Sequence, residues 1–168
     1  MSALIGANND GRAGLICYMP EGRGEQPYPA KASDVIAQGV VCCLDIANAT
    51  PAEKVYKVAK LDGTDKGPFV VTTKAKLAGE LTITGVGSGF EVTVWADGDI
   101  YGDAFVKPST ATAGQVMQGT DPILEANIYQ ARLNFAQYKR LYKYANSGDG
   151  NHPAAKAVDG DLIVIRIL

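Results

Sequence analysis

Along most of the chain, apolar residues recur at every second position, in short runs that turn residues separate. The run "KVYKVAKL" at 54–61 alternates in this way and ends at "DGTDKG", while "ELTIT" and "FEVTVWA" flank "GVGSG". Alternation is typical of half-buried strands, and the glycine-rich link predicts a hairpin over residues 80–96. The run "DLIVIRIL" at 161–168 is rich in β-branched residues and predicts a strand paired inside a sheet. Strands spaced about every 8–12 residues predict a mainly β fold, a small β-barrel or a β-sandwich.

One segment departs from this pattern and predicts a single short helix. Asp121 precedes Pro122, as an N-cap residue precedes proline at the first helical position. Apolar residues then follow at spacings of three and four, the period of an amphipathic helix. They are Leu124, Ile128, Ala131, Phe135, Tyr138 and Tyr142. We therefore predict a helix over residues 122–136. For residues 138–144, where "YKRLYKY" suits either state, we favour a strand.

Residues 1–33 differ from the rest, and we interpret them as an extended N-terminal arm ahead of a β-domain at 34–168. Glycine and proline are frequent there, and neither suits a helix or a central strand. Large apolar side chains nevertheless occur, where a solvated linker would hold few. They are Leu15, Ile16, Tyr18, Met19 and Tyr28. The pattern fits an arm that lies on another surface, and it fits a loosely packed leading loop equally well.

The composition restricts the class of protein. The 168 residues fit one domain with an appended arm, and 16 basic against 18 acidic residues give a net charge of -2. This charge argues against binding nucleic acid through bulk positive charge. The opening "MSALIGANNDGR" lacks the features of a signal peptide, and no apolar run is long enough to span a bilayer. We therefore expect no membrane association.

The cysteines predict free thiols rather than a disulfide framework. Cys17, Cys42 and Cys43 are an odd set with a vicinal pair. Successive strand residues point to opposite faces, so Cys42 and Cys43 are badly placed to share a metal ion. We expect free, buried thiols in a reducing compartment.

Three acids in "EVTVWADGDIYGDAFVKP" at 91–108 raise the question of a calcium loop. They are Asp97, Asp99 and Asp103. An EF-hand loop needs oxygen ligands at positions one, three, five and twelve, with glycine at six. With Asp97 at position one, Pro108 falls at position twelve, so the bidentate glutamate is missing. Asp-Gly is instead typical of tight turns. We predict that the acids shape turns and hold no metal ion.

No catalytic arrangement is evident, so we expect neither an enzyme nor a cofactor. The segment "TGVGSGF" at 84–90 has Phe90 where a dinucleotide loop has its third glycine, and a strand follows it instead of a helix. His152 is the only histidine, and a Ser-His-Asp or Cys-His set would have to use it. It lies among glycine, asparagine and proline with no nucleophile elbow, and we interpret it as a loop residue.

Basic and aromatic residues interleave between residues 126 and 148, where acids are absent. They are Tyr129, Arg132, Phe135, Tyr138, Lys139, Arg140, Tyr142, Lys143 and Tyr144. Such a set can dock on an acidic protein surface, stack on nucleic-acid bases, or form a solvated face over core aromatics. We favour the first and third possibilities over direct contact with nucleic acid.

Two segments together carry a pattern that resembles a known family. In "EVTVWADGDIYGDAFVKPSTATAGQVMQGTD" at 91–121, a strand, an acidic-glycine turn and a "GDAFVKP" step lead to a short "GQV" strand. In "RLYKYANSGDGNHPAAKAVDGDLIVIRIL" at 140–168, a basic-aromatic strand and a glycine-acid loop lead to the final strand. Residues 34–168 thereby resemble the small capsid decoration, or cement, proteins of tailed viruses of bacteria and archaea. The arm and the predicted helix are not part of the pattern.

The resemblance implies a β-module on the outer surface of an icosahedral virion, commonly a homo-trimer at three-fold positions. Such a module, assembled in the host cytoplasm, bridges neighbouring subunits of the major capsid protein against internal pressure. No catalytic residues carry over, because the family has none. Contacts repeated around a symmetric shell need only modest affinity each, because multivalency multiplies them.

We expect the arm and the basic-aromatic run to supply the capsid interface. The candidate residues are Leu15, Ile16, Tyr18, Met19, Tyr28, Tyr138, Arg140, Tyr142 and His152.

Two other functions stay open. A small β-barrel ligand- or carbohydrate-binding module would use Trp95 and tyrosines as stacking platforms, although the alternation of "EVTVW" places Trp95 in the core. A hydrolase would use Asp97, Asp99 or Asp103, with a carboxyl pKa raised in a cleft.

Overall fold

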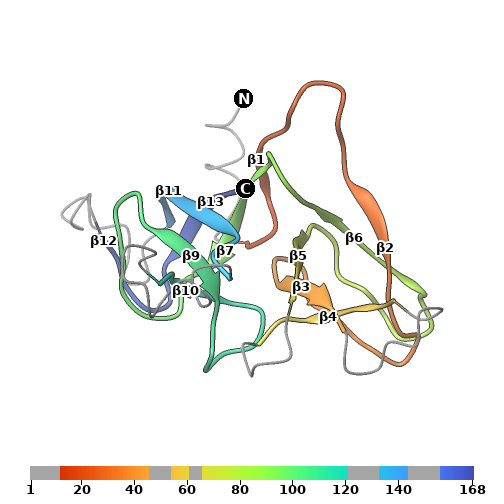
Figure 1. Ribbon diagram of the computed structural model, residues 1–168. Helices are drawn as coiled ribbons and strands as arrows, with labels where there is room; N and C mark the ends of the chain where they lie inside the picture. Colours follow the sequence, from red (N-terminus) through yellow and green to blue (C-terminus); the bar gives the residue numbers. More distant parts are fainter. Residues whose placement is uncertain (1–11, 46–53, 61–65, 121–132, 144–155) are drawn as a thin grey trace.

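The computed structural model describes residues 12–45, 54–60, 66–120, 133–143 and 156–168, which form β-strands and turns without a helix (Figure 1). Every pairing between the strands of this part is antiparallel, and the strands form two larger sheets and a two-stranded one. The mainly β class is confirmed. Both larger sheets have edge strands at each end, so neither closes into a barrel and the arrangement is sandwich-like.

The six-stranded sheet has the order β1-β7-β13-β11-β9-β10. Its strands are β1 (Ile16–Tyr18), β7 (Glu91–Trp95), β13 (Leu162–Ile167), β11 (Ala136–Lys143), β9 (Phe105–Pro108) and β10 (Val116–Gln118). Strand β13 pairs with β7 on one side and β11 on the other, and its apolar residues are buried. The run at 161–168 therefore forms an interior strand, as its β-branched residues predict.

The five-stranded sheet has the order β2-β6-β5-β3-β4. Its strands are β2 (Gln26–Pro29), β6 (Thr82–Val86), β5 (Lys66–Thr72), β3 (Val41–Leu44) and β4 (Tyr56–Val58). A two-stranded sheet pairs β8 (Ile100–Tyr101) with β12 (Lys156–Ala157). In Figure 1, β12 lies at the end of the molecule away from β2 and β6.

Two apolar clusters form the core. The first takes residues from both larger sheets, such as Val71 of β5 and Ile165 of β13, and so joins the sheets face to face. The second lies on the other face of the five-stranded sheet and includes Val70 and Ile83. Neighbouring residues such as Val70 and Val71 thus belong to different clusters, because successive strand side chains point to opposite faces.

The vicinal thiols follow the same rule. Cys43 lies in the first cluster and Cys42 in the second, and both side chains are fully buried. All three cysteines are free, and Cys17 is only half-buried. Burial, with a smaller effect of Cys43, raises the pKa of Cys42 well above the ordinary value of a thiol. The prediction of free thiols is confirmed, and that of full burial holds for the vicinal pair alone.

The hairpin predicted over residues 80–96 is wrong. Strand β6 pairs with β2 and β5, whereas β7 pairs with β1 and β13, so the link between them crosses from one sheet to the other. Glycines permit this close crossing: a Cβ at Gly85 would lie 2.6 Å from the carbonyl oxygen of Val71, and Gly89 has φ +90°. The sequence predicts the glycine-rich link correctly, but the strands on either side of it, β6 and β7, pair with other strands instead of with each other.

The predicted helix is wrong where it can be compared. Leu133–Asn134 are not helical and β11 begins at Ala136; residues 121–132 lie outside the described part. A bulge at Tyr138–Arg140 places Tyr138 and Leu141 on the same face, so Tyr142, a member of the predicted stripe, faces the other way. The strand favoured for 138–144 is confirmed by β11. No helix in the described part of the chain is long and apolar enough to cross a membrane.

The described part of the predicted arm lies on both larger sheets of its own chain. Strand β1 pairs with β7 and β2 pairs with β6, while the N–H of Leu15 donates to Thr93 Oγ1 at 3.0 Å. Figure 1 shows the loop between β1 and β2 arching away from the body of the molecule. Residues 12–33 thus supply edge strands to the sandwich. The domain boundary at residue 33 and contact with a neighbouring subunit stay predictions.

A buried lysine attaches the segment after β2 to the connection between β5 and β6. Lys76 is 1% exposed, and its Nζ donates to the carbonyl oxygens of Asp34 at 2.6 Å and Leu77 at 3.2 Å. The backbones of Ile36 and Lys76 also exchange hydrogen bonds of 3.1 and 2.7 Å. Because a buried ammonium group is costly without partners, these carbonyls fix where the segment lies.

We predict that Lys76→Met destabilises the fold. Methionine keeps much of the apolar stem of lysine but removes the N–H donors. The carbonyl oxygens of Asp34 and Leu77 then lose the hydrogen bonds from this side chain. The free energy of unfolding, measured by urea denaturation, should fall by about 1–3 kcal/mol. Lys74→Met is the control, because the Lys74 side chain is 69% exposed, and it should change stability by less than about 0.5 kcal/mol. Equal midpoints for both variants would contradict this role of Lys76.

Candidate functional site

The acids of the first Asp-Gly-Asp turn bind groups of their own chain. The hydroxyl of Ser109 donates to the carboxylate of Asp97. Asp99 forms an ion pair with Lys156 of β12, with 2.7 Å between Oδ2 and Nζ. The hydrogen bond that Lys156 donates to Asp99 raises the pKa of the lysine. Both carboxylates therefore connect this turn to neighbouring segments.

Asp103 owes its place to backbone shape. It has φ 59° in the turn between β8 and β9, and the N–H of Ala104 donates to the carbonyl of Tyr101 at 3.1 Å. Aspartate tolerates this left-handed conformation better than most residues other than glycine. The carbonyl of Asp103 also accepts a hydrogen bond from Gln137 at 3.0 Å.

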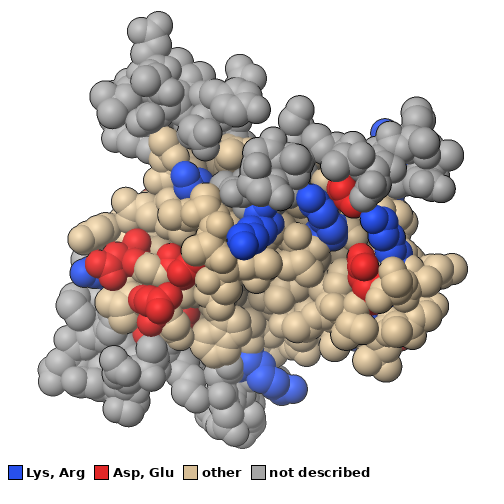
Figure 2. All heavy atoms as spheres, turned by 90° about the horizontal axis from the view of Figure 1, so that it is seen from below, with Lys and Arg blue, Asp and Glu red and all other residues tan. Residues whose placement is uncertain are grey.

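A second Asp-Gly-Asp turn at 159–161 meets the first one. Asp159 accepts a hydrogen bond from the N–H of Gly98 at 3.1 Å, and the buried Asp161 accepts one from Val158 at 2.9 Å. Figure 2 shows acidic side chains gathered at one end of the molecule, on the side where β12 lies in Figure 1. The two turns thus form an acidic end that their own hydrogen bonds organise.

These contacts agree with the prediction that the acids shape turns. Among the described residues, no group of three or more His, Cys, Asp or Glu side chains is placed to hold a metal ion. The carboxylates of Asp97, Asp99, Asp159 and Asp161 each have a protein partner. Their arrangement therefore supplies structure to the loops around β8 and β12.

The face of the six-stranded sheet turned away from the five-stranded sheet brings the two predicted interface regions together. Ile16 and Leu141 pack against the first cluster, so their neighbours Cys17 and Tyr142 point to the other face. Burial raises the pKa of Cys17, and the nearby Arg140 opposes that shift through its charge and a hydrogen bond. Tyr142 in turn lies near Cys17, Arg140 and Arg12. The arm and the basic-aromatic run therefore share one surface.

Arg166 extends this surface along β13. Its guanidinium lies 5.6 Å from the ring centre of Tyr18 and forms an ion pair of 2.8 Å with Glu91. The hydroxyl of Tyr142 is buried and has no hydrogen-bond partner among the described residues. We call the surface made by Arg12, Tyr18, Arg140, Tyr142 and Arg166 the arginine face.

The nine candidate interface residues do not all belong to it. Tyr18 and Met19 are about half exposed, at 48% and 47%, and Arg140 is exposed. Leu15 and Ile16 are half-buried beneath the face. Tyr138 is 2% exposed and packs in the first cluster, so its place among surface candidates is corrected. The remaining three are Tyr142, which is half-buried in the arginine face, Tyr28, which belongs to the five-stranded sheet, and His152, which lies outside the described residues.

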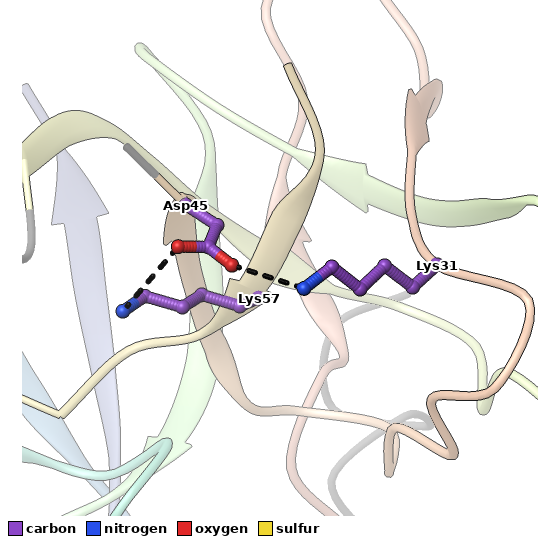
Figure 3. A network of polar contacts seen from close by, with 3 residues as sticks. All are labelled: Lys31, Asp45 and Lys57. Carbon is purple, nitrogen blue, oxygen red and sulfur yellow. Dashed lines mark hydrogen bonds and ion pairs between the residues drawn. The ribbon is translucent and has the colours of Figure 1, made fainter. Parts of the chain in front are cut away.

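A second charged group was missed by the sequence analysis. The Asp45 carboxylate is 7% exposed and lies between Lys31 at 3.3 Å and Lys57 at 4.0 Å (Figure 3). A carboxylate this well covered requires cationic partners. Lys31 follows β2 and Lys57 lies in β4, so the group attaches the end of the arm to the five-stranded sheet. The three residues of this group come from separate segments, so no local sequence motif predicts it.

A cleft of about 340 Å³ opens where the two larger sheets meet. Two aromatic pairs line it: the ring centres of Tyr28 and Tyr56 are 5.0 Å apart, and those of Phe69 and Phe135 are 5.1 Å apart. Arg23 stands at the cleft as well. Of these residues, the sequence analysis had singled out Tyr28 and Phe135, for other roles. Trp95, expected in the core, is half-buried and is not part of the lining.

Comparisons with known proteins give a likeness to a solved structure. No family model and no curated protein matches the chain. Among solved structures, the fold is similar to the N base of the head fiber protein gp8.5 of bacteriophage phi29. The TM-score is 0.48 at 12% sequence identity, and the alignment covers 86% of this chain and 95% of that chain. At this TM-score and identity, the likeness carries no argument about what this chain does.

The turn role of Asp103 leads to a prediction. Asp103→Ala removes the carboxylate and keeps the unfavourable φ, so the free energy of unfolding should fall by about 1 kcal/mol. Asp103→Gly removes the same carboxylate but accepts the φ, so stability should change by less than about 0.5 kcal/mol. Urea denaturation of both variants measures this. If glycine destabilises as much as alanine does, the carboxylate itself matters and the backbone explanation fails.

Proposed function

We propose that this protein is a non-enzymatic structural protein of a virion, which decorates the outer surface of an icosahedral capsid and bridges subunits of the major capsid protein. The observation that carries this proposal is the arginine face, where the arm and the basic-aromatic run meet on one face of the six-stranded sheet. The resemblance of residues 34–168 to capsid decoration proteins supplies the class of partner.

The chemistry of the arginine face favours a protein partner that is acidic. Arg12 and Arg140 are exposed, and Arg166 is exposed beside its partner Glu91. Arginine and tyrosine are the residues that protein interfaces use most for binding energy, because they combine apolar area with directed hydrogen bonds. The exposed guanidinium groups of Arg140 and Arg166 present N–H donors to which acidic side chains of a capsid subunit can bind.

The edge strand β1 offers a second kind of contact on the same surface. It is the outermost strand of its sheet and pairs with β7 alone among the described strands. Its other edge presents backbone groups to which an extended segment of a partner can add as a further strand. Exposed Tyr18 and Met19 lie at the end of this strand and supply apolar area to such a segment.

The remaining features support a role without catalysis. The acids that a hydrolase would need are used in turns, as described above. We propose that the chain forms a homo-trimer, because three copies around a three-fold position multiply weak contacts with the shell. This role requires no cofactor.

We predict that Tyr18→Ala with Arg140→Glu weakens binding to capsids. The probe is the shell of the virus that encodes this chain, purified and stripped of it, and bound protein is measured by co-sedimentation. The double variant loses an aromatic contact and reverses one charge, so its affinity should fall about tenfold or more. Circular dichroism checks that it is folded.

Lys74→Glu is the matched control, because Lys74 is exposed in the bend that follows β5. It reverses the same charge away from the arginine face and should bind shells as the unchanged chain does. Equal loss in both variants would indicate general charge attraction and contradict the proposed surface.

The oligomeric state is a separate prediction. Light scattering after size exclusion should give three times the 17.7 kDa of the chain. A monomer both in solution and on stripped shells would overturn the trimer while leaving capsid binding to be judged by co-sedimentation.

A further inference from the structure

The cleft between the two larger sheets has hydrogen-bonding groups that the fold does not use. No hydrogen bond joins the hydroxyl of Tyr28 or Tyr56 to another residue of the described part, and neither hydroxyl is closed off from the surface. Asn134, which also lines the cleft, is different, because its side-chain amide bonds both backbone groups of Thr120. Two phenol groups are thus left for a ligand.

Arg23 is held in place at the same cleft. Its Nη1 donates to the carbonyl oxygen of Ser88 at 2.7 Å, and its guanidinium lies 5.4 Å from the ring centre of Phe90. A guanidinium carries five N–H donors, so most of them stay available after this bond. Because the side chain is already fixed, a ligand would not have to order it.

The rest of the lining is apolar. Phe69 and Phe135 are largely buried, and Pro68, Val70 and Ile167 complete the wall. The cleft thus combines an apolar wall with a few hydrogen-bonding groups, and its volume falls in the range of small-molecule sites, about 300–1,000 Å³.

We propose that this cleft binds a neutral sugar ring of hexose size. The apolar C–H face of such a ring packs against the aromatic wall, while its hydroxyls accept from Arg23 and exchange hydrogen bonds with Tyr28 and Tyr56. An aliphatic ligand would displace water from the two phenols and from the remaining donors of Arg23 without replacing its hydrogen bonds, which is unfavourable. The inference goes beyond the proposed virion role and does not depend on it.

The phenols stay protonated over the whole neutral range. Burial raises the pKa of Tyr28, opposed by the charge of Arg23, and burial with the neighbouring Tyr28 and Cys43 raises that of Tyr56. Binding should therefore be independent of pH near neutrality.

Gly87 provides a way to fill the cleft without changing the core. A Cβ there would lie 3.5 Å from the Tyr28 hydroxyl oxygen and 3.9 Å from Val70, which is ordinary contact, and its φ is not in the left-handed region. Gly87→Leu thus extends a side chain into the site beside Tyr28. Ala113→Leu is the control, because it adds atoms at an exposed turn away from the cleft.

The test is a titration of the full chain, labelled with ¹⁵N, with glucose, galactose, mannose and N-acetylglucosamine in turn. At least one should cause saturable shifts of the Gly67, Gly87 and Ser88 amides with a Kd on the order of millimolar. Tyr28→Phe with Tyr56→Phe should weaken binding about tenfold at unchanged thermal stability, since no protein hydrogen bond is lost. Gly87→Leu should abolish it, whereas Tyr18→Phe and Ala113→Leu should leave it unchanged.

Several results would overturn the proposal. They are the absence of saturable shifts with all four sugars, binding that survives Gly87→Leu, and an equal loss in Tyr18→Phe. A titration with sodium acetate at matched ionic strength tests the anion alternative. If acetate alone shifts the same amides, the cleft is an anion site at Arg23 and the sugar assignment is wrong.

Discussion

The five-stranded sheet is buried on both faces, and the rest of the structure depends on this constraint. Successive residues of its strands, such as Cys42 and Cys43, enter different apolar clusters. One face is covered by the six-stranded sheet. The other needs a cover of its own, which the segment following β2 supplies through Ala30 and Ile36, held by Lys76. A two-layer sandwich with an exposed outer face would need neither this covering segment nor the buried lysine. The arm is therefore part of what makes the central sheet stable.

Local patterns predicted individual strands well and their partners poorly. The β-branched run at 161–168 and the opposed thiols follow from the chemistry and period of single segments. The helical stripe failed because Phe135 and Tyr138 both enter the first cluster although β11 begins at Ala136, so buried residues three apart occur here without a helix. The hairpin failed because Gly85 lets the chain pass close to β5 and on to the other sheet. Both errors concern pairing between distant segments, which a single sequence does not encode in any short window.

The candidate surfaces likewise divide into features that local sequence predicts and features that depend on distant segments. Acidic turns are recognisable from Asp-Gly dipeptides alone, since the backbone conformation is local. The arginine face joins β1, β11 and β13, and three of its five members, Tyr18, Arg140 and Tyr142, were expected because they lie in two recognisable runs of sequence. The cleft was missed because Arg23, Tyr56 and Phe69 come from unrelated segments. The arginine face and the cleft have no residue in common.

The position of β13 has a consequence for how the chain is made. This strand lies between β7 and β11, so the six-stranded sheet has a gap at its centre until residues 162–167 have left the ribosome. Strand β1 must also wait, because its partner Val92 follows long after Ile16. Until β13 has emerged, the apolar strands β7 and β11 lack a partner that they need, and the six-stranded sheet cannot be completed. For this chain, a cell's chaperones matter most before the last strand emerges.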